Sequence, residues 1–126
     1  MAVFAFSIRR FLRVGFVMGL ALVLIFALLP HPPVLPYLDS DSLQHGAAFA
    51  GLTIAARMAW PDLHWASIYV SLAGFGLTLE ILQSMAPTGR TAELADWAAD
   101  CAAIAVVLLL SEIWRHVQRK ASHSVP

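Results

Sequence analysis

Residues 63–85 read LHWASIYVSLAGFGLTLEILQSM, and Glu80 is the only charged residue among them. A helix needs about 20 mostly apolar residues to cross the hydrocarbon core of a bilayer. This stretch meets that length, and Pro87 follows it at a point where a helix is expected to stop. We therefore predict a membrane-spanning helix that carries Glu80 inside it, where a carboxyl group needs a partner.

The rest of the chain has the same apolar character. Its 126 residues are 60% hydrophobic and 13% charged, whereas soluble domains are roughly 45–50% apolar and about 25% charged. Three more apolar stretches, residues 14–29, 43–60 and 94–114, also end at prolines or charged residues. The sequence therefore predicts an all-α fold, a four-helix transmembrane bundle over residues 14–114.

The basic residues indicate the orientation of this bundle. Lys and Arg are enriched on the cytoplasmic side of membrane proteins. With both termini inside, seven of the eight basic residues are cytoplasmic and only Arg90 is outside. We therefore predict a multi-pass protein of the bacterial plasma membrane, N-in and C-in, with residues 1–13 and 115–126 in the cytoplasm. The seven residues are Arg9, Arg10, Arg13, Arg57, Arg115, Arg119 and Lys120.

Composition also limits the possible partners. The formal net charge is zero, so nothing indicates a nucleic-acid partner. Cys101 is the only cysteine, which excludes an internal disulfide framework and a multi-cysteine metal site. The expected partners are membrane lipids or a lipid-linked ligand, and the oligomeric state is left open.

Three pairs of polar residues interrupt the apolar stretches near the predicted outer side of the membrane. The members of each pair are three or four residues apart, so they share one face of their helix. Arg90 follows in the loop between the third and fourth spans. We expect these residues to form one ligand-binding layer at the outer interface: Asp41, His45, Glu80, Gln83, Asp96, Asp100 and Arg90.

This layer is acidic, which restricts what it can bind. Four carboxyl groups cannot share a small pocket uncompensated, so either some are protonated or a cation, such as a divalent metal ion, binds among them. Asp41 and Asp96 stand at helix starts, where a purely structural role as N-caps is an alternative. Glu80 makes no cap, so it is the strongest functional candidate.

These residues resemble the VanZ-like family of small membrane proteins. In that family Asp-Lys-x-x-His opens one span, Glu-x-x-Gln lies near the end of the next, an Arg follows, and Asp-x-x-x-Asn begins the last span with a Gly nearby. The counterparts here are DSLQH at 41–45, EILQ at 80–83, Arg90, and DWAAD at 96–100, and the resemblance covers residues 39–105. It implies a cell-envelope protein and a contribution to glycopeptide (teicoplanin) resistance, and it implies no particular reaction.

Three positions depart from the family pattern. Ser42 replaces a Lys, Asp100 replaces an Asn, and Ala103 replaces a Gly. The first two changes remove a cation and add an anion, so this site is more acidic than the family's. The roles of family residues in ligand binding therefore do not transfer directly to this chain.

Four functional hypotheses follow. The first is binding of a lipid-linked or amphiphilic ligand at the outer interface. The second is an intramembrane enzyme, dependent on a metal or on acid/base chemistry, that acts on a phosphate-containing envelope lipid; its catalytic candidates are His45, Glu80 and Asp41, with Arg90 holding the phosphate. The third is ion translocation, which the apolar inner half disfavours. The last is a polar network that only stabilises the bundle.

Overall fold

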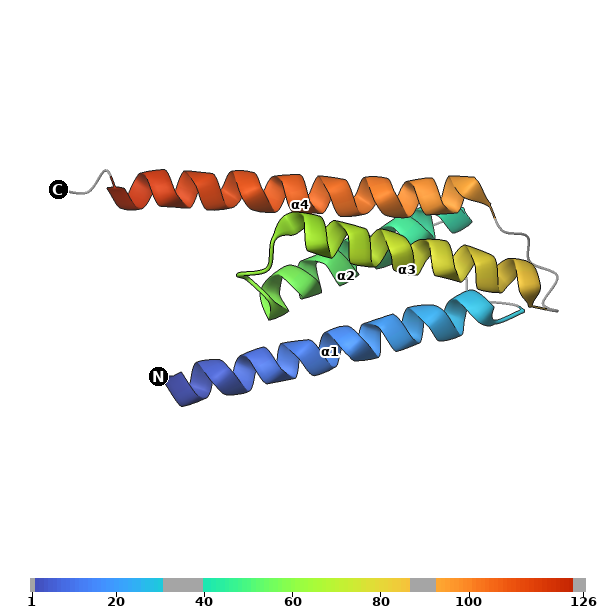
Figure 1. Cartoon of the computed structure of the whole chain (residues 1–126), viewed down its shortest axis with the longest axis horizontal. Helices are drawn as coiled ribbons and strands as arrows, with labels where there is room; N and C mark the ends of the chain where they lie inside the picture. Colours follow the sequence, from blue (N-terminus) through green and yellow to red (C-terminus); the bar gives the residue numbers. More distant parts are fainter. Residues whose placement is uncertain (1, 31–39, 87–92, 124–126) are drawn as a thin grey trace.

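The computed structural model describes residues 2–30, 40–86 and 93–123, and these residues form four α-helices and no strands (Figure 1). The all-α prediction is therefore confirmed. The helices are α1 (Ala2–Leu28), α2 (Asp41–Ala59), α3 (Trp65–Met85) and α4 (Leu94–His123).

Three of these helices are long and apolar enough to cross a membrane. Their apolar stretches are Ile8–Leu28 in α1, Trp65–Met85 in α3 and Leu94–Ser122 in α4. Large apolar side chains such as Val17, Val70 and Leu109 are exposed on their outer surfaces. Such surfaces suit contact with lipid chains rather than water. These three helices support the expectation of a membrane protein. Helix α2 is not among the three.

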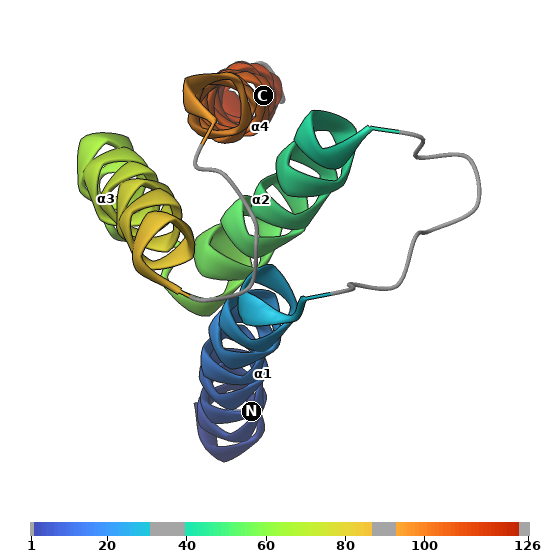
Figure 2. The same cartoon turned by 90° about the vertical axis from the view of Figure 1, so that its right-hand side faces the viewer.

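The position of α2 explains its lower hydrophobicity. Seen along the bundle, α2 lies between α1 and α4, and α3 lies beside α4 (Figure 2). The most extensive packing is between α2 and α4, and α2 also packs against α1 and α3. Phe49 and Leu52 of α2 are buried in a core with Leu79 of α3 and Ile104 of α4. A helix that packs against three others leaves less of its own surface exposed, so it needs fewer apolar residues.

Local signals explain where α2 and α3 begin and end. The hydroxyl of Ser40 caps α2 by accepting a hydrogen bond from the backbone N–H of Leu43 at 3.2 Å. The helix stops at Ala59, just before Trp60 and Pro61. Nδ1 of His64 then caps α3 by accepting from the N–H of Ala66 at 3.2 Å.

The outer two helices extend beyond the predicted spans. α1 begins at Ala2 rather than near residue 14, and α4 continues to His123 rather than ending near residue 114. Hydropathy marks the part of a helix that suits lipid, whereas the backbone can remain helical through the basic flanks. The start of α1 and the end of α4 lie at the same end of the bundle, which also holds the turn between α2 and α3 (Figure 1).

Basic side chains tie this end of the bundle together. Arg13 of α1 donates to the carbonyl of Ala59 at 3.4 Å. Arg57 forms an ion pair with Glu112 of α4 and donates to the carbonyl of Leu63. Arg115 of α4 donates to the carbonyl of Pro61 in the turn after α2, and it lies 3.7 Å from the same Glu112 carboxylate. The turn after α2 is therefore held by arginines from three helices.

Candidate functional site: a buried polar cluster

Three helices bring polar side chains together at the end opposite the termini. A possible ligand atom from each of His45 on α2, Glu80 on α3 and Asp96 on α4 lies within 4.8 Å of the others. Glu80 and Asp96 are only 5% exposed. Together with Asp100, which contacts the same imidazole, these residues are called the polar cluster below.

Asp100 is the most deeply placed member of the polar cluster. The residue is fully buried, and its Oδ1 lies 3.5 Å from Nδ1 of His45. A Cβ atom added to Gly76 of α3 would stand 2.8 Å from Oδ2 of Asp100. Only glycine therefore fits at position 76 without displacing the carboxylate, and this close approach lets α3 pack directly against the site.

Two donors hold the other carboxylates. The hydroxyl of Ser42 donates to Oδ1 of Asp96 at 2.5 Å. The backbone N–H of Glu93, just before α4, donates to Oε2 of Glu80 at 2.8 Å. Each of these two contacts connects different helical segments, so they fix the mutual positions of α2, α3 and α4 around the polar cluster.

Several polar atoms of the cluster lack a hydrogen-bond partner within the described part of the chain. They are Oε1 of Glu80, both carboxylate oxygens of Asp100 and Nδ1 of His45, and all are buried. The His45–Asp100 approach is close enough for an ion pair but does not meet hydrogen-bond geometry. Because an unsatisfied buried polar group costs about 1–3 kcal/mol, their concentration in one place makes the polar cluster the candidate functional site.

Two other predicted site residues, Asp41 and Gln83, are described by the structure and lie outside the polar cluster. Asp41 is in the first turn of α2 but is exposed and lies outside the polar cluster, and the cap of that helix is Ser40 rather than Asp41. Gln83 is buried and donates to the carbonyl of Ala27 at 3.0 Å, so it ties α3 to the end of α1. Arg90 lies outside the described residues. Four of the seven predicted residues are thus brought together: His45, Glu80, Asp96 and Asp100.

Two residues beside the polar cluster were missed at the sequence level. The sequence identified Ser42 only as a replacement for the lysine of the VanZ-like pattern. In the structure its hydroxyl donates a hydrogen bond to Asp96. Gly76 precedes Glu80 by four residues, so it shares the same helix face. A glycine one turn from a buried carboxyl group is a signal of close helix approach that the sequence already contains.

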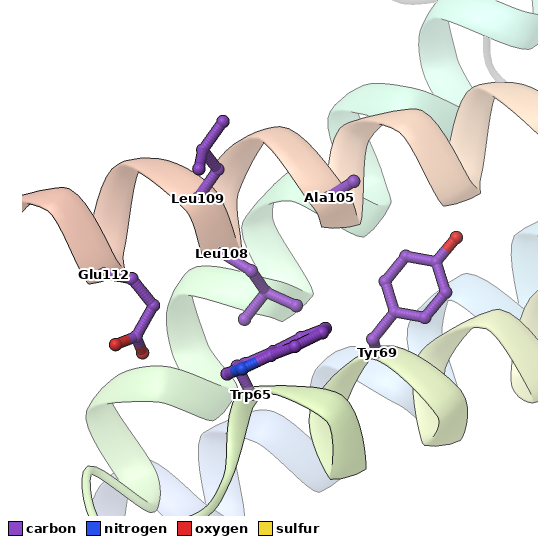
Figure 3. Close-up of a pocket in the computed structure, with 6 residues that line it drawn as sticks. All are labelled: Trp65, Tyr69, Ala105, Leu108, Leu109 and Glu112. Carbon is purple, nitrogen blue, oxygen red and sulfur yellow. The ribbon is translucent and has the colours of Figure 1, made fainter.

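A separate groove opens between α3 and α4 nearer the termini. It has a volume of about 490 Å³, and the ring of Trp65 lies beneath Leu108 (Figure 3). No residue of the polar cluster lines it, so it does not alter the assignment of the candidate site. Its lining is mostly apolar and consists of Trp65, Tyr69, Ala105, Leu108, Leu109 and Glu112.

Comparison of the chain with protein-family models, with curated proteins and with solved structures finds no match. The resemblance to the VanZ-like family therefore rests on the residues that carry it. Among those residues, the structure brings His45, Glu80, Asp96 and Asp100 into one buried cluster.

Proposed function

We propose that this chain is a VanZ-like multi-pass protein of the bacterial cell envelope, and that its polar cluster binds the polar group of a lipid-linked or amphiphilic ligand at the outer membrane interface. One observation carries the proposal. Exposed apolar side chains lie one or two residues along the chain from members of the buried polar cluster, on the same three helices: Leu43, Ile81 and Leu94. A ligand with a polar group and an apolar tail would match this combination.

The proposal treats α2 as a fourth span. Its contacts with all three other helices support this assignment, because the neighbours shield its polar residues from lipid. The proposed orientation rests on the positions of the basic residues. Arg13, Arg57 and Arg115 gather at the end that holds both termini, and basic residues favour the cytoplasmic side. In this orientation the polar cluster faces the outer leaflet.

The charge of the polar cluster defines the ligand further. Three carboxyl groups surround one imidazole, so a bare phosphate or other anion would be repelled. The ligand must either carry a positive group or bind together with a cation. Its apolar part would lie along the exposed side chains of α2, α3 and α4.

Photolabelling tests the ligand site. Full-length protein is reconstituted with a phosphatidylethanolamine probe that carries a diazirine on its headgroup. We expect labelled peptides from residues 41–46 and 94–100, with labelling reduced severalfold by Glu80→Gln and unchanged by Asp62→Asn. This control removes a carboxylate from a side chain that is 88% exposed. Uniform labelling along the helices, or labelling indifferent to Glu80→Gln, would overturn the proposed site.

Cysteine accessibility tests the orientation. The native thiol is first removed by Cys101→Ala, and a single cysteine is then introduced by Leu94→Cys or His116→Cys, both at exposed positions. A membrane-impermeant maleimide added to intact cells should label position 94 and not position 116. The reverse pattern would place the polar cluster on the cytoplasmic side and contradict the proposal.

Resistance is tested in cells. Expression of the wild-type chain in a teicoplanin-sensitive strain should raise the inhibitory concentration of the drug, and Glu80→Gln should abolish the increase at equal protein level. An unchanged inhibitory concentration with normally folded protein in the membrane would remove resistance from the proposed function.

An enzymatic function is the second candidate, and the approach of His45 to Asp100 favours it. A carboxylate beside Nδ1 is the usual means of orienting a histidine that acts as a general acid or base. Asp41 lies outside the polar cluster, which leaves His45 and Glu80 as the candidate catalytic residues. Phosphate release from an undecaprenyl diphosphate substrate, lost in His45→Ala and retained in His116→Ala, would support this function; no release by the wild type would exclude that reaction.

A further inference from the structure

We infer that the polar cluster is a binding site for a divalent metal ion, with His45, Glu80 and Asp96 as its protein ligands and Asp100 as a positioning residue. The inference deepens the proposed function, because it names the cation that would neutralise the site. It rests on four observations: the distances between the possible ligand atoms, the contacts that hold the three ligand side chains, the buried oxygens without hydrogen-bond partners, and the combination of imidazole with carboxylate groups.

The distances are close to those of a metal site. Bonds from first-row metal ions to imidazole nitrogen or carboxylate oxygen are about 2.0–2.2 Å long, so the ligand atoms of one ion lie roughly 3–4.4 Å apart. Here the three atoms lie within 4.8 Å of one another. Side-chain shifts of roughly a few tenths of an ångström would bring the three atoms within bonding distance of one ion. That ion would connect α2, α3 and α4.

Each of the three residues already has a second contact that would hold it as a ligand. Ser42 donates to Asp96, and the N–H of Glu93 donates to Glu80. Asp100 lies against Nδ1 of His45, the arrangement in which a carboxylate commonly orients a metal-bound imidazole. Such outer contacts usually accompany metal ligands, and they leave one oxygen of Glu80 without a partner.

The unpartnered atoms point to a ligand independently of the acidic composition. Oε1 of Glu80 and both oxygens of Asp100 are buried and have no hydrogen-bond partner within residues 2–30, 40–86 and 93–123. A finished structural network would pair these atoms. A bound ion satisfies the Glu80 oxygen directly and offsets the buried negative charge of Asp100.

The ligand types indicate which ions would bind. Calcium and magnesium prefer oxygen ligands alone, whereas imidazole together with carboxylates suits manganese, iron and zinc. One histidine and two carboxylates therefore favour Mn²⁺, Fe²⁺ or Zn²⁺ over Ca²⁺ and Mg²⁺ at this site.

Equilibrium dialysis with metal analysis tests the inference. Full-length protein without a polyhistidine tag is placed in phosphatidylcholine nanodiscs, stripped with a chelator and dialysed against Mn²⁺ or Zn²⁺ alone. We expect one ion per chain. Glu80→Gln and His45→Ala should weaken binding roughly tenfold or more. The exposed-residue controls Asp62→Asn and His116→Ala should leave binding unchanged.

A measurement on the wild type keeps the inference testable if a variant fails to fold. Electron spin echo envelope modulation of bound Mn²⁺ should show coupling to one histidine nitrogen. Absence of a nitrogen coupling, absence of saturable binding, or binding unaffected by Glu80→Gln would overturn the metal site. Absence of saturable Mn²⁺ binding, together with phospholipid photolabelling at residues 41–46 and 94–100, would overturn the metal site and leave the proposed function standing. Saturable Mn²⁺ binding without labelling at residues 41–46 or 94–100 would overturn the proposed ligand site and leave the metal site standing.

Discussion

Nδ1 of His45 and Oδ1 of Asp100 lie 3.5 Å apart, which joins α2 to α4 at a point where Asp100 is fully buried. The helices that meet there are also the pair with the most extensive packing. Neither carboxylate oxygen of Asp100 has a hydrogen-bond partner among the described residues, so the imidazole of His45 is the group positioned to offset the buried charge. A protonated His45 imidazole or a bound cation would stabilise the buried carboxylate of Asp100. Without such a positive partner, a buried carboxylate is energetically costly.

Asp100→Asn should separate stability from ion binding. The amide keeps the shape of the side chain and removes the buried negative charge, so the free energy of unfolding without added metal should rise by about 1–3 kcal/mol. Mn²⁺ affinity should fall, because the charge that balances the ion is lost. Thermal unfolding in detergent with and without Mn²⁺ measures both effects. Asp62→Asn, whose side chain is 88% exposed, is the control that should change neither quantity.

Ser42→Lys should replace the metal ion with a fixed positive charge. The ammonium group would stand beside Asp96, where the hydroxyl of Ser42 now donates at 2.5 Å. We expect the variant to unfold at a higher temperature without metal and to bind Mn²⁺ roughly tenfold more weakly. Ser42→Ala serves as the comparison, since it removes the hydrogen bond, worth about 1 kcal/mol, without adding charge. Equal Mn²⁺ affinity in the lysine and alanine variants would count against cation compensation at this position.

The apolar stretches and the prolines after them predicted the four helices well. The predicted second span, 43–60, corresponds to α2 (Asp41–Ala59), and the third, 63–85, corresponds to α3 (Trp65–Met85). The start of α1 and the end of α4 extend beyond the predicted spans, because basic residues are unfavourable in the hydrocarbon core of a membrane but have high helix propensity. Spans, orientation and membrane depth remain predictions, whereas the helices themselves are observed.

Spacing predicted which residues share a helix face, but not which faces meet. Asp41 and His45 are four apart, yet only His45 belongs to the polar cluster, and Ser42 of the same turn donates to Asp96 of α4. Each step along a helix turns the side chain by about 100°, so the rotation of α2 about its axis decides this outcome. That rotation is set by packing against α1, α3 and α4 together, which a pattern within one helix does not contain.

Gly76→Ala should damage the polar cluster without changing any of its chemical groups. The new methyl group would come within 2.8 Å of Oδ2 of Asp100 and 3.3 Å of the Phe49 ring. We expect a loss of about 1–3 kcal/mol in unfolding free energy and weaker Mn²⁺ binding, because Asp100 must move. Gly74→Ala on the same helix meets nothing within 4 Å and should not destabilise the fold, because alanine favours a helix over glycine by about 0.5–1 kcal/mol. Similar unfolding curves and affinities for the two variants would show that α3 does not approach α4 this closely.

Glu112→Gln tests whether the two ends of the bundle act independently. The guanidinium group of Arg57 is paired with Glu112, and the side chain of Arg57 is only 8% exposed, whereas that of Glu112 is 36% exposed. Removing the carboxylate leaves a largely buried cation unpaired, so the free energy of unfolding should fall by about 1–3 kcal/mol after allowance for solvent screening.

Adding Arg57→Met to Glu112→Gln should recover part of that loss, because the unpaired charge disappears. Residue 112 lies twelve residues after Asp100 in α4, which corresponds to about 18 Å along the helix axis. Mn²⁺ affinity should therefore be the same in the wild type, in Glu112→Gln and in the double variant, as measured by equilibrium dialysis. A parallel fall in stability and Mn²⁺ affinity would mean that the arginine end controls the geometry of the polar cluster, and the two ends would then have to be treated as one unit.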